Sequence, residues 1–259
     1  MMKPTTVQER NLYATWRTWL VLAMLVLAMG CALPLLPDVL WQIFQEIDNQ
    51  LLLACNYDGG FVIDQFWFAF SSFRTWIPLM IVLGLELFLA CDGSWRKRLL
   101  FLVCLVLMLT LLDQLSSGVI KHFVARPRPS HDPAICGLLH YVNGYHGGRY
   151  GFVSGHATNI AGLATWLCLI FRRPLTRLAF GVFAVMLCYS RMYLGVHYPS
   201  DILCGALLGF TIAYLLFRLM RRWFTFSTDG RTPLLNTTMV ITVIVIMAHS
   251  AFMMLGLGL

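Results

Sequence analysis

Charged residues are scarce in this sequence, where they make up 12% of 259 positions. Soluble globular domains carry roughly a quarter charged residues, so the shortage argues against an ordinary water-soluble domain. Hydrophobic residues instead account for 59% of the chain, and several apolar runs approach the ~20 residues that cross a bilayer. We therefore predict an all-α, polytopic transmembrane helical bundle in which residues 1–259 form a single membrane-embedded domain.

The sequence also lacks C-x-x-C pairs, a spacing typical of zinc sites and redox motifs. Its eight cysteines fall mostly in apolar segments, where cysteine behaves as a small hydrophobic residue. We therefore expect no zinc site. Cys55 and Cys136 fall on the same predicted outer face, and the sequence leaves open whether they form a disulfide.

Seven apolar segments indicate a bundle of six or seven spans, at residues 18–36, 75–91, 99–120, 152–171, 175–194, 200–217 and 235–254. The polar stretch before the first segment is long for a signal-peptide n-region, so we interpret that segment as an uncleaved anchor. Residues 121–150 form the one long polar loop.

Most of the Lys and Arg residues fall on one side of a seven-span arrangement. They are Lys3, Arg10, Arg17, Arg96, Lys97, Arg98, Arg172, Arg173, Arg177, Arg218, Arg221, Arg222 and Arg231. The positive-inside rule makes that side cytoplasmic. Because these loops account for the net charge of +7, we predict no nucleic-acid partner.

Residues 38–73 combine apolar positions at helical spacing with a polar opposite face. The apolar set is Trp41, Ile43, Phe44, Ile47 and Leu51, and the polar set is Gln45, Glu46, Asp48 and Asn49. This pattern predicts an amphipathic helix on the outer membrane surface, followed by a turn at Gly59-Gly60.

Residues 189–201 place Arg191, His197 and Asp201 between two apolar runs. Pro199 and the following apolar run predict a helix start, which puts Asp201 in the first turn, four residues after His197. A carboxylate on one imidazole nitrogen leaves the other free to act as a nucleophile or base. Taken alone, the stretch is equally well interpreted as a polar cluster that ends two helices.

Two more polar clusters fall on the same outer face. Lys121 and Arg128 are seven residues apart and, if helical, share a face, although such residues also snorkel to headgroups. Ser154-Gly155-His156 opens the fourth predicted span, where free N–H groups favour an anion. An ordinary serine cap is the alternative for that tripeptide.

Together the three clusters resemble the signature of the type 2 phosphatidic acid phosphatase (PAP2) superfamily, in its integral-membrane lipid phosphatase branch. The matching patterns are K-x6-R-P at residues 121–129, S-G-H at 154–156 and S-R-x5-H-x3-D at 190–201. The motif core thus covers residues 121–201. Val153 stands where the family usually has proline before S-G-H. The spacing selects Arg128 for the R-P pair and leaves Arg126 as a supporting charge.

The resemblance implies a role for each motif residue. His197 attacks phosphorus and becomes a phosphohistidine, Asp201 holds its tautomer, and His156 protonates the leaving oxygen and then activates water. The groups that hold the phosphoryl oxygens are Lys121, Arg128, Ser154, Gly155 and Arg191. Arg126 and Arg149 are candidate headgroup contacts. Asp113, eight residues before Lys121, is interpreted as a structural partner for a buried polar group.

No metal or cofactor is expected, because three fixed cations can do the work of a magnesium ion and carboxylates are few near the clusters. The predicted function is hydrolysis of a phosphomonoester or terminal diphosphate of a lipid at the outer leaflet of a bacterial inner membrane, with the site facing the periplasm. The long loop favours lipid A or undecaprenyl diphosphate over phosphatidylglycerol phosphate or phosphatidate. Membrane lipids are the expected partners, and no obligate protein partner is inferred. An anionic-lipid transporter or flippase is the non-enzyme alternative.

Overall fold

The computed structural model describes residues 38–228 and 233–254, and within them it contains helices and loops but no β-strand. The helices are α2 (Asp38–Cys55), α3 (Phe61–Ser71), α4 (Ile77–Ala90), α5 (Trp95–Asp113), α6 (Lys121–Val124), α7 (Gly155–Ile170), α8 (Pro174–Tyr193), α9 (Pro199–Met220) and α10 (Pro233–Met254). A π-helical stretch, Gln114–Ile120, joins α5 to α6. The all-α prediction is therefore confirmed, while the expected first span lies outside the described residues.

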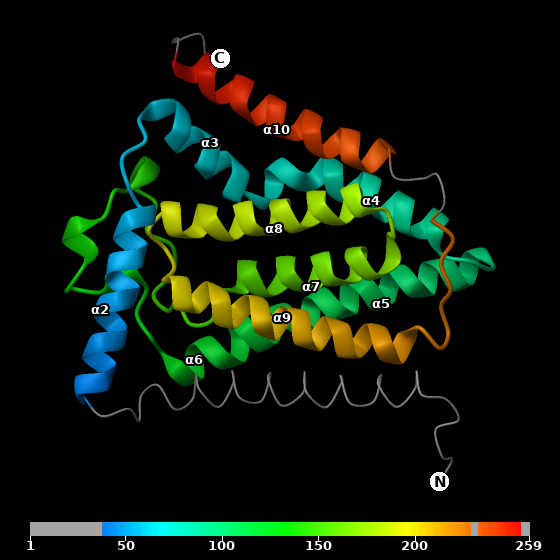
Figure 1. Cartoon of the computed structure of the whole chain (residues 1–259), viewed down its shortest axis with the longest axis horizontal. Helices are drawn as coiled ribbons and strands as arrows, with labels where there is room; N and C mark the ends of the chain where they lie inside the picture. Colours follow the sequence, from blue (N-terminus) through cyan, green and yellow to red (C-terminus); the bar gives the residue numbers. More distant parts are fainter. Residues whose placement is uncertain (1–37, 229–232, 255–259) are drawn as a thin grey trace.

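Five helical segments in the described part of the chain are long and apolar enough to cross a membrane: Phe73–Ala90, Trp95–Val124, Pro174–Tyr193, Pro199–Met220 and Leu235–Met254. Each coincides with a predicted span. The remaining predicted span, residues 152–171, forms α7, which has only 16 residues and is therefore about 24 Å long. Figure 1 shows α7 enclosed among α5, α8 and α9, so this short helix is a core element of the bundle.

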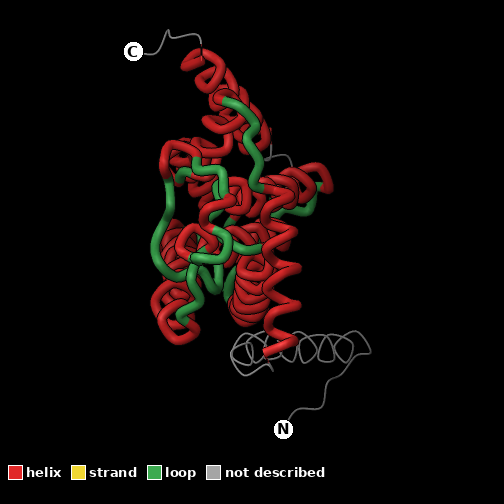
Figure 2. Tube along the Cα trace, turned by 90° about the vertical axis from the view of Figure 1, so that its left-hand side faces the viewer, coloured by secondary structure: helices red, strands yellow, loops and turns green. Residues whose placement is uncertain are grey.

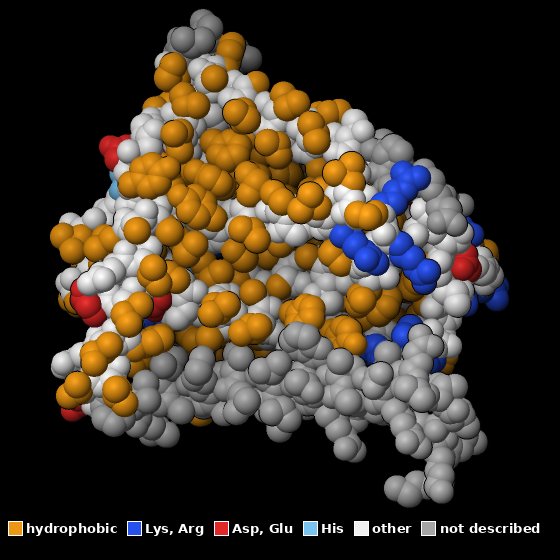
Figure 3. All heavy atoms as spheres, in the orientation of Figure 1, with side chains coloured by type: hydrophobic (Ala, Val, Ile, Leu, Met, Phe, Trp, Pro, Cys, Tyr) orange, Lys and Arg blue, Asp and Glu red, His pale blue; other side chains and the backbone are white. Residues whose placement is uncertain are grey.

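The two ends of the bundle differ in charge. Figure 3 shows Lys and Arg side chains gathered at the end where α5 and α8 begin and α9 ends. The opposite end, seen face-on in Figure 2, is covered by loops. The three motif clusters lie at this loop-covered end, because α6, the start of α7 and the α8–α9 connection are all found there.

Close packing of α7 on α9 depends on two glycines spaced four residues apart. A Cβ on Gly209 would lie 2.0 Å from the Thr158 carbonyl oxygen, and one on Gly205 would lie 2.6 Å from that of Ser154. Small residues at this spacing let helix backbones approach closely. The indole of Trp166 strengthens the same contact by donating a hydrogen bond to the Ala213 carbonyl at 2.8 Å.

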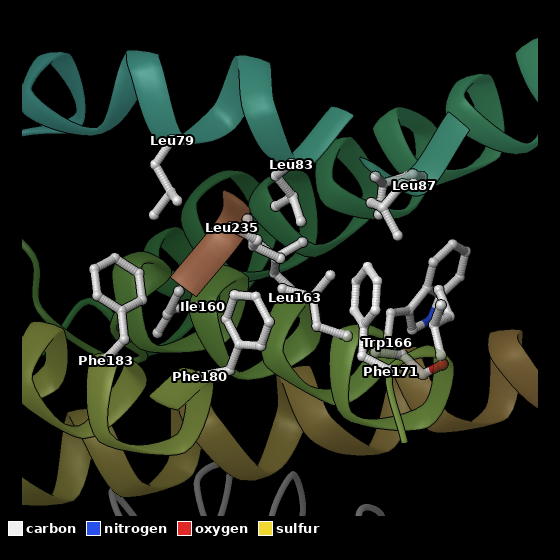
Figure 4. Close-up of a cluster of buried hydrophobic side chains, with 14 of the residues drawn as sticks. Leu79, Leu83, Leu87, Ile160, Leu163, Trp166, Phe171, Phe180, Phe183 and Leu235 are labelled. Carbon is white, nitrogen blue, oxygen red and sulfur yellow. The ribbon is translucent and has the colours of Figure 1, made fainter. Parts of the chain in front are cut away.

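A hydrophobic core fills the space between these helices and α4. Figure 4 shows leucines of α4 facing aliphatic and aromatic side chains of α7 and α8, with Leu235 of α10 beside them. Phe183 packs edge-on against Trp76, with ring centroids 4.5 Å apart. This core fixes the positions of the helix ends that carry the motifs.

Helix α2 runs across the ends of the bundle helices at the loop-covered end (Figure 1). Its outward stripe, Ile43, Ile47 and Leu51, is 53% exposed at each position, whereas Asp48 on the opposite face is buried. The amphipathic pattern is therefore present, with Asp48 of its polar face against the protein and the stripe of Ile43, Ile47 and Leu51 outward, while Trp41 and Phe44 pack against the bundle. Cys55, at the end of α2, and Cys136 are both unpaired.

Candidate active site

His197 and Asp201 form a buried pair at the start of α9. The imidazole Nδ1 lies 3.4 Å from Asp201 Oδ2, and the backbone N–H of Tyr198 donates to the same oxygen at 3.1 Å. Asp201 is the third residue of α9, so the helix start itself aims the carboxylate back at the ring. Nδ1 is thus the ring nitrogen that faces the Asp201 carboxylate.

The His197 ring lies within electrostatic range of all three motif cations. Burial, together with the positive charges of Arg128, Arg191 and Lys121, lowers the pKa of His197 well below its ordinary value. The ring is therefore neutral at neutral pH, which is the protonation state that a nucleophile requires. The second histidine, His156, is close enough for its charge to interact with His197.

The S-G-H tripeptide forms the start of α7. Ser154 is fully buried, and its Oγ accepts a long hydrogen bond of 3.5 Å from the Ala157 N–H, as a helix cap does. Its own N–H donates to the Asp201 carbonyl oxygen at 3.0 Å, which ties α7 to the start of α9. A Cβ on Gly155 would lie 2.5 Å from Ser117 Oγ, so a larger residue there would require the Ser117 side chain to move. His156 is exposed.

Arg191 and Arg128 are both buried, with part of each guanidinium unused. Arg191 donates to Ser71 Oγ and, at 3.2 Å, to Tyr145 Oη, while Arg128 Nε donates to the Tyr150 carbonyl at 3.0 Å. Arg191 Nε and Arg128 Nη1 are buried without a hydrogen-bond partner among the described residues. A buried charged group without partners is costly, so an anion is the partner that this arrangement lacks.

A cavity of about 460 Å³ is lined by Lys121 and Arg128 together with apolar side chains of the bundle. At one end it is lined by Lys121, Arg128, Gly155 and His156. An adjoining cavity of about 260 Å³ is lined by His156 and Arg191 together with residues such as Tyr145. The two cavities are thus lined by five of the predicted site residues, Lys121, Arg128, Gly155, His156 and Arg191. Ser154, His197 and Asp201 are buried and do not line either cavity.

Arg126 occupies a different environment from the one expected of a headgroup contact. It is 5% exposed and donates to Asp201 Oδ1 at 3.0 Å and to Asp48 Oδ2 at 2.7 Å. Its guanidinium also lies 4.1 Å from the centre of the Tyr198 ring. Because both terminal nitrogens of its guanidinium bind residues within the protein, and only Nε lacks a partner among the described residues, Arg126 serves to hold Asp201. Arg149, in contrast, is exposed, with its guanidinium 5.5 Å from the Tyr150 ring centre.

Sequence reasoning missed three residues that support the site. Asp48 was expected on the polar face of a surface helix, yet it binds Arg126 and accepts a 3.0 Å hydrogen bond from the Ser200 N–H. Ser71 and Tyr145 hold Arg191. None of the three residues belongs to a motif. Asp48 is marked only by its burial on the polar face of an amphipathic helix.

The described residues contain one group of potential metal ligands, formed by Asp58, Asp64 and His140. It includes no motif residue. His140 Nε2 is already 2.8 Å from Asp64 Oδ2, and Tyr193 donates to the same carboxylate. This cluster is therefore separate from the site built on His197.

The buried His–Asp pair and the cation-lined cavities thus belong to an all-helical membrane protein. Residues 100–225 match the family model of the PAP2 superfamily. The chain belongs to this superfamily.

Two similar proteins are lipid A 4'-phosphatases. The one from Porphyromonas gingivalis is 36% identical over 174 residues, which cover 67% of this chain and 72% of the relative. The one from Bacteroides thetaiotaomicron is 34% identical over 169 residues, which cover 65% and 74%. The fold is similar to the crystal structure of a transmembrane PAP2-type phosphatidylglycerolphosphate phosphatase from Bacillus subtilis. That comparison has a TM-score of 0.58 at 22% identity and covers 79% of this chain and 96% of the other.

Proposed function

We propose that this protein hydrolyses a phosphate from a membrane lipid, with lipid A favoured over undecaprenyl diphosphate, through a phosphohistidine formed on His197. The observation that carries the proposal is the composition of the larger cavity. Its cationic end is followed by an apolar wall made by Phe73, Trp76, Met80, Leu109, Ile160, Leu163, Phe183 and Leu187. A lipid phosphate matches both ends, since its charge suits the cations and its acyl chains suit the wall.

The geometry supports a two-step reaction. In the first step His197 Nε2 forms a bond to phosphorus while the bond from phosphorus to the lipid oxygen breaks, and His156 gives that oxygen its proton. In the second step His156 takes a proton from water, whose oxygen attacks phosphorus and releases His197. Asp201 stabilises the positive ring formed between the steps.

The remaining motif groups hold the transferred phosphoryl group. We assign the unused N–H groups of Arg128 and Arg191 to hydrogen bonds with the phosphoryl oxygens. Lys121, the Ser154 hydroxyl and the Gly155 amide are assigned to bind the same oxygens. These donors offset the charge that develops on the phosphoryl oxygens. We propose that the reaction needs no metal ion, because fixed cations already supply this function.

The distribution of Lys and Arg residues between the two ends of the bundle supports a site on the periplasmic side of a bacterial inner membrane. The Arg-rich ends of α5, α8 and α9 lie at the end of the bundle away from the motifs (Figure 3). By the positive-inside rule those ends are cytoplasmic. Both substrate candidates would then be met in the outer leaflet.

Phosphate release from a panel of lipids tests the proposal. Purified protein in detergent micelles is given lipid A, undecaprenyl diphosphate, phosphatidylglycerol phosphate and phosphatidate, each with and without EDTA. We expect release to be fastest from lipid A and unchanged by EDTA. His197→Ala should abolish release, whereas His122→Ala, which alters an exposed histidine beside Lys121, should keep it. Absence of release from every lipid, or loss with EDTA, would contradict the proposal.

A transporter would behave differently in the same variants. A carrier needs no nucleophile, so His197→Ala should leave lipid movement across proteoliposomes largely intact. An enzyme with this site should lose turnover while it still binds the lipid phosphate.

A further inference from the structure

Two polar side chains lie in the wall of the larger cavity, among its apolar residues. Asp113 ends α5, and Asn159 belongs to α7. Asn159 Nδ2 donates to Asp113 Oδ1 at 3.4 Å, and Ser117 Oγ donates to the same oxygen at 3.4 Å. The pair therefore forms a polar patch inside the part of the cavity that we assign to the lipid.

The free atoms of this patch are hydrogen-bond acceptors. Asn159 Oδ1 is buried and has no hydrogen-bond partner in the described part of the chain. Turning the amide over would only place this oxygen against the Asp113 carboxylate, so the orientation is fixed. No hydrogen bond to Asp113 Oδ2 comes from the residues that the structure describes. Two acceptor atoms on residues that line the cavity thus lack donors in the described part of the chain.

The patch lies just beyond the phosphate site. Asn159 follows His156 by three residues on α7, which places it about 4.5 Å further along the helix and on nearly the same face. Unpaired polar groups in an apolar wall are costly, and ionisable residues within membrane segments generally mark substrate sites. The missing donors are therefore expected on the ligand, near its phosphate.

We propose that Asp113 and Asn159 form a specificity subsite that accepts hydrogen bonds from amide N–H or hydroxyl groups next to the lipid phosphate. The inference rests on the proposed function and narrows it to lipids built on an amino sugar. Lipid A carries amide and hydroxyl donors near its phosphates. The glycerol esters of phosphatidate offer acceptors only, and the isoprenoid chain of undecaprenyl diphosphate offers hydrocarbon.

The selectivity of variants among lipid substrates distinguishes this subsite from the purely structural role that the sequence suggested for Asp113. Asn159→Leu keeps a similar side-chain volume and removes the acceptor, and Asp113→Asn is a second variant that preserves shape. A matched control is Asn236→Leu in α10, whose Oδ1 is also buried without a partner but whose amide donates to Thr176, outside this cavity. The measured quantity is kcat/KM for lipid A, phosphatidate and undecaprenyl diphosphate.

For either site variant, we expect kcat/KM to fall about tenfold or more on lipid A, the loss that corresponds to one hydrogen bond to a charged or buried group. On phosphatidate and undecaprenyl diphosphate it should change less than about threefold, and the Asn236→Leu control should leave all three unchanged. Equal losses on all three lipids, or no loss on lipid A, overturn the subsite while the phosphatase proposal stands. Wild-type protein that is inactive on every lipid overturns the phosphatase proposal itself, and the subsite with it.

Discussion

Arg126 and His197 contact different oxygens of the Asp201 carboxylate: Arg126 donates to Oδ1 at 3.0 Å, while His197 Nδ1 lies 3.4 Å from Oδ2. The same guanidinium donates to Asp48 Oδ2 at 2.7 Å. Asp48 belongs to α2, whose opposite face carries the exposed apolar stripe. A helix suited to the membrane surface is thus connected to the His–Asp pair by two buried ion pairs.

Replacing Asp48 by asparagine should lower kcat with little change in KM. Removal of this charge breaks one of the two ion pairs that fix the Arg126 guanidinium, so Arg126 no longer holds Asp201 and the His197 ring in a fixed position. Since small misplacements of reacting groups are costly, we expect kcat to fall about 10- to 100-fold. Steady-state kinetics on the best lipid substrate measure both constants.

Glu46→Gln provides the control for this substitution, because Glu46 lies on α2 with an exposed side chain. It should leave both constants unchanged. An Asp48→Asn enzyme with a raised KM and normal kcat would mean that Asp48 acts on substrate binding, contrary to the positioning role.

Removing a cation from the pocket should move the acid limb of the pH profile. Burial and the charge of Arg128 lower the pKa of His197, so the nucleophile stays neutral into the acid range. In Arg128→Gln that pKa should rise, and the acid limb of kcat/KM should shift to higher pH. The substrate ionises identically for both enzymes, so a shift of the acid limb reflects a changed pKa in the protein. Profiles with superimposable acid limbs would show that Arg128 does not tune the nucleophile.

Much of the site was predictable because its key relationships are local in sequence. His197 and Asp201 are four residues apart across a helix start marked by Pro199, and the S-G-H tripeptide needs only its place before an apolar run. The supports are not local. Arg126 and Asp48 are 78 positions apart, and Arg191 and Ser71 are 120 apart. Such contacts depend on how helices cross, which hydrophobic periodicity does not determine.

The fold shows the same division. Of the seven apolar runs, five coincide with described helices that are long and apolar enough to cross a membrane, because span length follows from bilayer thickness. The central helix α7 proved to be shorter than predicted, since it is enclosed by neighbours and does not need full bilayer length. For α2, periodicity predicted an amphipathic helix, but only the tertiary structure shows that Asp48 on its polar face is buried.

Substituting alanine for Gly209 should destabilise the protein. The new Cβ would lie 2.0 Å from the Thr158 carbonyl oxygen, so α7 and α9 would have to separate. Overpacking of this kind costs about 1–3 kcal/mol, and it also displaces the helix that carries His156. Thermal unfolding in detergent should show a lower midpoint. Gly181→Ala is the matched control, because a Cβ there meets no atom within 4 Å. Equal midpoints for both variants would contradict the close-packing role.

Loss of the second histidine should trap the covalent intermediate. In His156→Ala an activated substrate such as p-nitrophenyl phosphate can still phosphorylate His197, because its leaving group needs little help from an acid. Hydrolysis of the intermediate has then lost its base, so radiolabelled phosphate should accumulate on the protein. Phosphohistidine is identified by its lability to acid and stability to alkali. The His156→Ala, His197→Ala double variant should carry no label. Label that persists in the double variant would place the nucleophile elsewhere, and absence of label in His156→Ala despite turnover would favour direct attack by water.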